Sequence, residues 1–388
     1  MEPAQTVNEV YYLKQIIELK NEIINLQKKE LLEKDKIINE DKERIHELEL
    51  LLQTKQIEKK NNSTNNNTPN ITPNPIITPG DINILEKEAI FKIDDLKSNY
   101  YTIYILQDGR IAAGGYSTSI IIYNKETFKS EMTIKEHSGS SIRYLTQLKN
   151  GNLVSLGDDA YINIYCLLDN FKYLVLQKIK SHSSVVYKLR EFENERFMTC
   201  SSDCTIKFFF KNKNEYIEDY TFKDDIKIYN ILRTKEGEIV YAGSQYTNNT
   251  STYYIRFYDL KSRKKIDSTK ITTFSTGTSD VLYMLSKIYL LVGAYGYILI
   301  FDINQHRQIK EIKLDNSDYI TSFLKIDEST LLSVDNNGKI RQWIINDDNL
   351  ILECVKEKAH EGYIYMIRRN QDGLLITCSS DNSIKVWA

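Results

Sequence analysis

The chain has 388 residues and a formal net charge of −2, a length that allows one to three domains. The charge balance gives no reason to expect nucleic acid or an anionic membrane surface as the main partner. No stretch approaches the roughly 18 apolar residues of a membrane span, and the N-terminus "MEPAQTVNEVYYLK" lacks the basic region and apolar core of a secretory signal.

The first predicted element, residues 1–60, is a coiled-coil helix. An apolar residue recurs at every seventh position: Val10, Ile17, Ile24, Leu31, Ile38, Ile45 and Leu52. This period is typical of a coiled coil, and its apolar stripe needs a partner, either a second copy of the chain or another helical protein. The second heptad column is poor in apolar residues, so the number and orientation of the helices stay open. Packing of the stripe on the protein's own globular part is the alternative.

Residues 61–85 contain "NNSTNNNTPNITPNPIITPG". This composition leaves little to bury and predicts a disordered linker. Three threonines precede prolines here, at Thr68, Thr72 and Thr78. They are candidate sites of proline-directed phosphorylation, although low-complexity drift is the simpler interpretation.

From residue 86 onward the apolar period changes from seven to two, and short strands alternate with turn signals such as Asp108-Gly109 and Asn337-Gly338. Seven strands end on an aromatic residue at spacings of 42 to 49 residues: Tyr123, Tyr165, Phe209, Tyr258, Phe301, Trp343 and Trp387. This period is that of a four-stranded propeller blade. Residues 86–388 are therefore predicted to be all-β, forming a seven-bladed β-propeller.

The repeats resemble the WD40 family, most clearly in the last copy, "HEGYIYMIRRNQDGLLITCSSDNSIKVWA". The resemblance implies that His360, Thr377, Asp381 and Trp387 form a hydrogen-bonded structural set. Two further copies keep most of the set, and the sixth copy lacks the histidine. The corresponding residues are His182, Thr199, Asp203 and Phe209; His137, Ser155, Asp159 and Tyr165; and Ser333, Asn337 and Trp343. The first, fourth and fifth copies lack both the histidine and the turn aspartate.

No pattern in the sequence predicts catalysis, a cofactor or a metal site. The histidine sets recur once per repeat, as structural bonds do, whereas a catalytic triad is a single constellation. There is no phosphate-binding glycine loop and no CxxC pair for zinc. The basic loop Lys261 to Lys265 reads as a solvated turn. Five scattered cysteines favour a reducing compartment, so we expect a cytoplasmic protein, with the nucleus not excluded. They are Cys166, Cys200, Cys204, Cys354 and Cys378.

The last repeat supplies only three strands before the chain reaches Ala388. An unpaired sheet edge is a liability, and "EAIFKI", residues 88–93, is the one spare strand. We expect residues 88–93 to pair beside residues 384–387 and to close the ring.

A tyrosine register provides the candidate binding site. Each repeat is expected to open its first strand with an apolar residue followed by one further residue. This further residue is tyrosine in five of the seven repeats, although the chain of 388 residues has only 27 tyrosines. The resemblance implies that this column lies at the channel mouth, where partners dock, and tyrosine and arginine dominate binding hot spots. The alternative is a structural ring that fills the mouth. The predicted protein-binding residues are Tyr104, Arg143, Tyr187, Tyr229, Tyr283, Tyr319, Tyr363 and Tyr365.

These features predict a non-enzymatic interaction scaffold or adaptor. The coiled coil would oligomerise the chain or recruit a helical partner, and the propeller's top face would bind a protein or peptide. Two narrower alternatives stay open. The order of coiled coil, linker and propeller looks like that of an autophagy adaptor, and a helix followed by seven blades resembles a heterotrimeric G-protein β subunit.

Overall fold

The computed structural model describes residues 88–93, 99–168, 171–193, 195–235, 237–271, 280–315 and 318–388. The predicted coiled coil (1–60) and linker (61–85) lie outside the described residues, and the domain boundaries stay predictions. Within these ranges the regular secondary structure is all strand. No helix in this part of the chain is long and apolar enough to cross a membrane.

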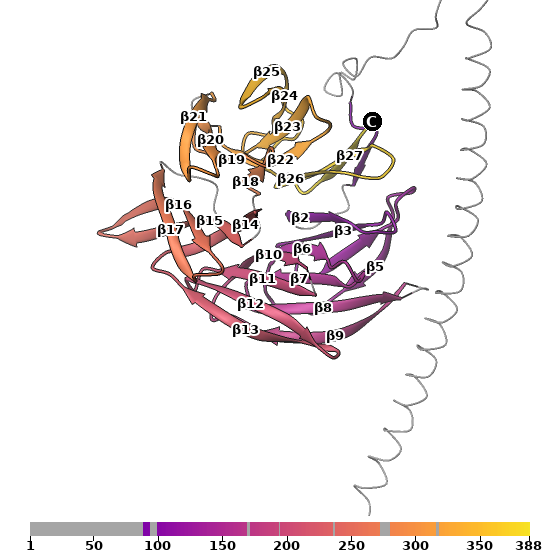
Figure 1. The fold of residues 1–388 in the computed structure, drawn as a ribbon. Helices are drawn as coiled ribbons and strands as arrows, with labels where there is room; N and C mark the ends of the chain where they lie inside the picture. The colour runs from indigo at the N-terminus through magenta and orange to yellow at the C-terminus, as the bar shows by residue number, and fades with distance from the viewer. Residues whose placement is uncertain are drawn as a thin grey trace, which may run out of the picture. The chain divides into compact units, whose positions relative to one another are not determined.

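The strands form seven four-stranded antiparallel sheets, the blades, around a common centre (Figure 1). Blade 1 holds β2 (Tyr100–Ile105), β3 (Ile111–Gly115), β4 (Ile120–Tyr123) and β5 (Ser130–Ile134). Blade 2 holds β6 (Ile142–Gln147), β7 (Leu153–Gly157), β8 (Tyr161–Leu168) and β9 (Lys172–Lys180). Blade 3 holds β10 (Val186–Phe192), β11 (Arg196–Ser201), β12 (Thr205–Asn212) and β13 (Glu215–Lys223).

Blade 4 holds β14 (Lys227–Lys235), β15 (Glu238–Thr247), β16 (Thr250–Asp259) and β17 (Lys264–Ile271). Blade 5 holds β18 (Leu282–Met284), β19 (Tyr289–Ala294), β20 (Tyr297–Asp302) and β21 (Arg307–Lys313). Blade 6 holds β22 (Ile320–Lys325), β23 (Thr330–Asp335), β24 (Ile340–Asn346) and β25 (Asn349–Lys356). Blade 7 holds β26 (Ile364–Arg369), β27 (Leu375–Ser379), β28 (Ile384–Trp387) and β1 (Phe91–Ile93). The prediction of an all-β, seven-bladed propeller is confirmed.

We call the four strands of each blade a to d in the order given above. Strand a lies nearest the centre of the propeller and strand d lies outermost, and strand d is the least buried. Second strands such as β7 and β27 are buried along their whole length, because neighbouring blades cover both of their faces. The fourth strand β9 is mostly exposed. Apolar clusters fill the spaces between adjacent blades; one joins Leu332 and Val334 of blade 6 to Ile364 and Trp387 of blade 7.

Blade 7 takes its outer strand from the other end of the described chain. Phe91 pairs with Val386, and Ile93 pairs with Ile384. Ile93 is buried in a cluster with Tyr100 of blade 1 and with residues of blade 7. This β1–β28 ladder therefore joins the first and last blades and leaves no open edge on β28.

Blade 4 differs from the others in its long β15–β16 hairpin. The two strands pair from Glu238 and Asp259 to Thr247 and Thr250. Asn248 and Asn249 close the turn with φ values of 49° and 61°, the left-handed region that asparagine tolerates in two-residue hairpin turns. The hairpin accounts for the longest spacing between the aromatic strand ends, the 49 residues from Phe209 to Tyr258.

Candidate functional site: an aromatic belt on the top face

The candidate site lies where the first strands begin, on the face that carries the loops between strands d and a and between strands b and c. We call this the top face. A register shift marks the start of six first strands, for example between Val186 and Lys188 of β10. One residue bulges out of the ladder at each shift, and bulges commonly re-aim side chains at functional rims. The bulged residues are Tyr101, Arg143, Tyr187, Tyr229, Thr321 and Tyr365.

Blade 5 follows the same register without a described bulge. Its Leu282 pairs with Val292, as Leu189 pairs with Thr199 in blade 3. The bulged Tyr187 lies two residues before Leu189, so the equivalent position in blade 5 is Asp280. The top-face row thus contains four tyrosines, one arginine, one threonine and one aspartate.

This register corrects two members of the predicted column. Tyr104 pairs with Ala112, three residues along β2 from the bulged Tyr101, and Tyr283 pairs with Leu291, three residues beyond Asp280. The sequence alignment placed these two tyrosines wrongly because it took Ile103 and Leu282 as the residues that precede the bulge. Both residues instead pair with the middle of strand b, two residues beyond the bulge position. The Tyr283 hydroxyl instead accepts a hydrogen bond from the Lys325 amide at 3.0 Å.

The remaining predicted residues lie together on the top face. Starting in blade 5, ring centroids follow one another at 6.3 Å from Tyr295 to Tyr319, 5.8 Å to Tyr363, 4.5 Å to Tyr365 and 5.0 Å to Tyr101. The series ends where the Arg143 guanidinium lies 5.0 Å above the Tyr101 ring. We call these six residues the aromatic belt. The belt spans blades 5, 6, 7, 1 and 2.

Tyr187 and Tyr229 form a second aromatic pair, with centroids 5.2 Å apart, in blades 3 and 4. The Tyr229 hydroxyl is 3.0 Å from the Ser244 hydroxyl. Burial raises the pKa of Tyr187 to about 12 and that of Tyr365 to about 12. These phenols are therefore neutral at physiological pH and can donate hydrogen bonds to a partner.

Arg143 is held in place by a carboxylate. Its Nε and one terminal nitrogen donate to the two oxygens of Asp158 at 2.5 and 2.8 Å, a bidentate pair that fixes the guanidinium plane. The same plane covers the Tyr101 ring. Arg143 is therefore pre-oriented, which lowers the entropic cost of using it as a contact.

Tyr101 and Tyr295 belong to the belt but were not predicted as site residues. Tyr101 would have been found by anchoring blade 1 on the residue that faces strand b, because "YTIYIL" then aligns with "RYLTQL" and Tyr101 takes the position of Arg143. Tyr295 follows β19 and reaches the belt through a single bridge to Tyr319. No periodic pattern in the sequence marks that contact.

The three histidine sets are structural bonds within their blades. His360 lies 2.9 Å from Asp381 and 2.7 Å from Thr377, and the Trp387 indole donates to Thr377 at 3.0 Å. The sets of His182 and His137 repeat this geometry. Each set ties the loop before strand a to strand b. In the described part of the chain no group of three or more His, Cys, Asp or Glu residues could hold a metal ion.

Two blades without the histidine use a loop aspartate instead. In blade 4, Asp224 accepts from Arg256 at 2.7 Å and from the Tyr241 hydroxyl. Tyr241 and Arg256 pair across β15 and β16 at the positions that Thr199 and Lys207 hold in blade 3. In blade 6, Asp318 contacts Arg341 of β24. In these two blades an aspartate in the loop before strand a therefore links that loop to the neighbouring strands, in place of the histidine.

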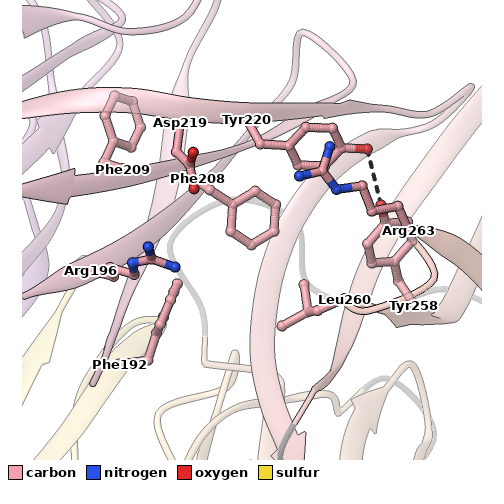
Figure 2. Close-up of a pocket in the computed structure, with 9 residues that line it drawn as sticks. All are labelled: Phe192, Arg196, Phe208, Phe209, Asp219, Tyr220, Tyr258, Leu260 and Arg263. Atoms are coloured by element: carbon pink, nitrogen blue, oxygen red, sulfur yellow. Dashed lines mark hydrogen bonds between the residues drawn. The ribbon is translucent and has the colours of Figure 1, made fainter. Parts of the chain in front are cut away.

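A pocket of about 180 Å³ lies at the opposite end of the strands, near the a–b turn of blade 3 and the c–d turn of blade 4 (Figure 2). Arg263 lies 4.2 Å above the Tyr220 ring, and the Tyr220 and Tyr258 hydroxyls are 3.1 Å apart. None of the predicted site residues lines it. The lining residues are Phe192, Arg196, Phe208, Phe209, Asp219, Tyr220, Tyr258, Leu260 and Arg263.

Comparison with known proteins agrees with this architecture. Residues 352–388 match the family model described as WD domain, G-beta repeat. The match covers β26, β27 and β28 and includes the complete His360 set. No curated protein matches the chain significantly.

Proposed function

Because the chain carries a WD40 repeat within a seven-bladed β-propeller, we propose that it is a protein-interaction scaffold whose aromatic belt binds a protein or peptide. The observation that carries this proposal is the unbroken series of ring contacts from Tyr295 to Tyr101 on one face. Tyr295 is 44% exposed, and its neighbours in the belt are half-buried. Tyrosines in this state offer large contact area at low entropic cost.

The first experiment compares the partners captured by the full chain with those captured by a triple variant of the belt, Tyr319→Ala, Tyr363→Ala and Tyr365→Ala. The proposal expects specific partners to be lost from the triple variant. Phe171→Ala is the matched control, since Phe171 is an aromatic residue, 59% exposed, at the c–d turn of blade 2. Equal capture by all three proteins would contradict the proposal.

We further propose that residues 1–60 oligomerise the chain or recruit a helical partner, as the heptad pattern indicates. Two propellers on one oligomer would bind a partner with two binding sites more tightly than one propeller does, because the second contact becomes intramolecular. Light scattering on the full chain and on residues 86–388 tests the oligomeric alternative. An oligomeric full chain and a monomeric propeller would support it, and two monomers would exclude self-association.

The autophagy-adaptor and G-protein β alternatives both fit a helix followed by this propeller. The Asn/Thr/Pro-rich segment favours the adaptor, since β subunits pass from helix to propeller with little spacer. Cytoplasmic localisation is proposed on the basis of cysteine chemistry. The structure describes all five cysteines and joins none of them in a disulfide, as a reducing compartment would keep them.

A further inference from the structure

The turn between strands c and d holds a residue with a positive φ at the same place in blades 1, 4 and 5. This residue lies five positions after the aromatic end of strand c, and its φ is 53° at Phe128, 55° at Arg263 and 53° at His306. In all three blades the residue two positions later pairs with that aromatic residue. Phe128, Arg263 and His306 are therefore structurally equivalent.

In blades 1 and 5 the side chain at this position is a ring that packs against the preceding blade. Phe128 is 8% exposed, and its ring centroid lies 5.0 Å from that of Phe91 on β1, the outer strand of blade 7. The His306 ring lies 4.9 Å from the Phe257 ring of blade 4. In these two grooves between blades, the chain itself supplies the aromatic ring.

Blade 4 has an arginine at this position, and a cavity remains in its groove with blade 3. The Arg263 guanidinium lies 4.2 Å from the centre of the Tyr220 ring on β13. Tyr220 holds the place that Phe91 holds in blade 7, because each pairs with the residue before the aromatic end of strand c. Beside this contact lies a cavity of about 180 Å³ (Figure 2). We call it the blade 3–4 pocket.

The blade 3–4 pocket has the size and the lining for one aromatic ring. An apolar cavity of about 150 Å³ is already large enough to bind benzene. Phe208 lies in the middle of the lining and is 8% exposed. It precedes the aromatic end of strand c, as Phe257 does in blade 4. A ring that enters the pocket would therefore pack against Phe208 as the His306 ring packs against Phe257. The other apolar and aromatic lining residues are Phe192, Phe209, Tyr220, Tyr258 and Leu260.

Two guanidinium groups border the pocket on opposite sides. Arg196 begins β11 and Arg263 lies in the c–d turn of blade 4, and Figure 2 shows Phe208 between them. Both arginines are exposed, and neither side chain has a hydrogen bond or ion pair with another residue in the described part of the chain. Asp219 also lines the pocket and leaves the lining with a charge of +1. Since guanidinium groups bind carboxylates through paired hydrogen bonds, the pocket favours a ring with carboxylates beside it.

We propose that the blade 3–4 pocket binds a partner peptide that presents one aromatic side chain flanked by acidic residues. The ring fills the cavity, as Phe128 fills the equivalent position in blade 1, and the flanking carboxylates reach Arg196 and Arg263. The pocket lies at the opposite end of the strands from the aromatic belt. It is therefore a second, independent docking site that goes beyond the proposed function.

Fluorescence anisotropy with the full chain tests the proposal. The probe is fluorescein-labelled Glu-Glu-Phe-Glu-Glu, amidated at its C-terminus. Two control peptides carry alanine in place of phenylalanine, or lysine in place of every glutamate. We expect saturable binding of one probe per chain, weakened about tenfold or more by loss of the ring and weakened as well by the lysines. Absence of saturation, or equal binding of the three peptides, would overturn the proposal.

Arg263→Phe places the binding in the pocket, because it gives blade 4 the ring that blade 1 already has. Phe128 shows that phenylalanine adopts this φ. We expect the variant to lose probe binding while its melting temperature stays equal or rises. Arg307→Phe is the matched control, since Arg307 is an exposed arginine at the start of β21 that does not line the pocket. Wild-type affinity in Arg263→Phe would overturn the assignment.

Two charge variants test the acidic part of the ligand. Arg196→Gln should weaken probe binding about two- to fivefold, the effect of one exposed ion pair. Asp219→Asn should strengthen binding, since it removes a carboxylate that repels the probe. Opposite signs at two residues of one pocket would not follow from a purely structural role. Unchanged affinity in both variants would overturn the proposed ligand class.

Discussion

At the scale of single residues, the hydroxyl of Thr377 forms hydrogen bonds with two buried polar groups, the His360 imidazole and the Trp387 indole. It lies 2.7 Å from His360 Nε2 and accepts from the Trp387 indole at 3.0 Å. His360 is 1% exposed and Thr377 is 0% exposed. A buried donor that loses its partner costs the free energy of its desolvation. The repeated sets therefore contribute to stability in each blade that has one.

Thr377→Val keeps the side-chain shape and removes this hydroxyl. We expect the free energy of unfolding to fall by about 1–3 kcal/mol, because the indole and imidazole groups lose a hydrogen-bond partner. Thr133→Val, at an exposed site on β5, is the control and should change stability by less than about 0.5 kcal/mol. Chemical denaturation measures both variants. Equal stability of the two variants would show that the set is not a structural bond.

The same set gives stability a pH dependence. Burial lowers the pKa of His360 despite the opposing effect of Asp381. Burial alone would raise the pKa of the Asp381 carboxyl, but hydrogen bonds from His360, Ser383 and the Glu361 amide hold it well below its usual range. In both cases the unfolded chain takes up protons more readily than the folded one. Stability is therefore full above about pH 6.5 and is lost on acidification.

Melting temperatures measured from pH 7.5 down to about pH 4 test this sign. We expect little change down to about pH 6.5 and a continuous decrease below it, with a smaller decrease in His360→Asn, which lacks the imidazole. A melting temperature that rises as the pH falls from neutrality would contradict the assigned protonation states.

At the scale of elements, the sequence indicated strand count and blade period well, because alternation and turn residues are local signals. It did not indicate the bulges at the starts of the first strands. Tyr104 and Tyr283 were misplaced by three residues because a bulge depends on the register with strand b, and that register is set by pairing. The Asp224–Tyr241–Arg256 set in blade 4 was missed for a different reason. Its members match the family pattern in position but not in residue type.

The β1–β28 ladder leads to a prediction at this scale. Ile93→Ala should lower the free energy of unfolding by about 2–5 kcal/mol, because Ile93 fills the apolar cluster between the first and last blades. Ile90→Ala is the control: Ile90 is 54% exposed, and its substitution should cost less than about 0.5 kcal/mol. Denaturant melts of both variants measure the difference. A small effect of Ile93→Ala would mean that β1 does not contribute to closing the ring.

At the scale of the whole molecule, seven blades place their first strands around one centre, and this arrangement assembles the aromatic belt. Its six residues come from five blades, so no single repeat contains the site. Periodicity in the sequence predicted the ring, and the tyrosine register predicted part of the belt. Tyr295 could not be predicted, because its contact with Tyr319 joins loops of different blades.

The most direct test of the central claim measures the dissociation constant of a captured partner for the full chain and for Tyr363→Ala, together with both melting temperatures. Tyr363 contacts Tyr319 and Tyr365 at the middle of the belt. A hot spot there predicts binding weakened by about 2 kcal/mol or more, with the melting temperature nearly unchanged. Unchanged affinity with a clearly lower melting temperature would show that the belt is a structural ring and would contradict the claim.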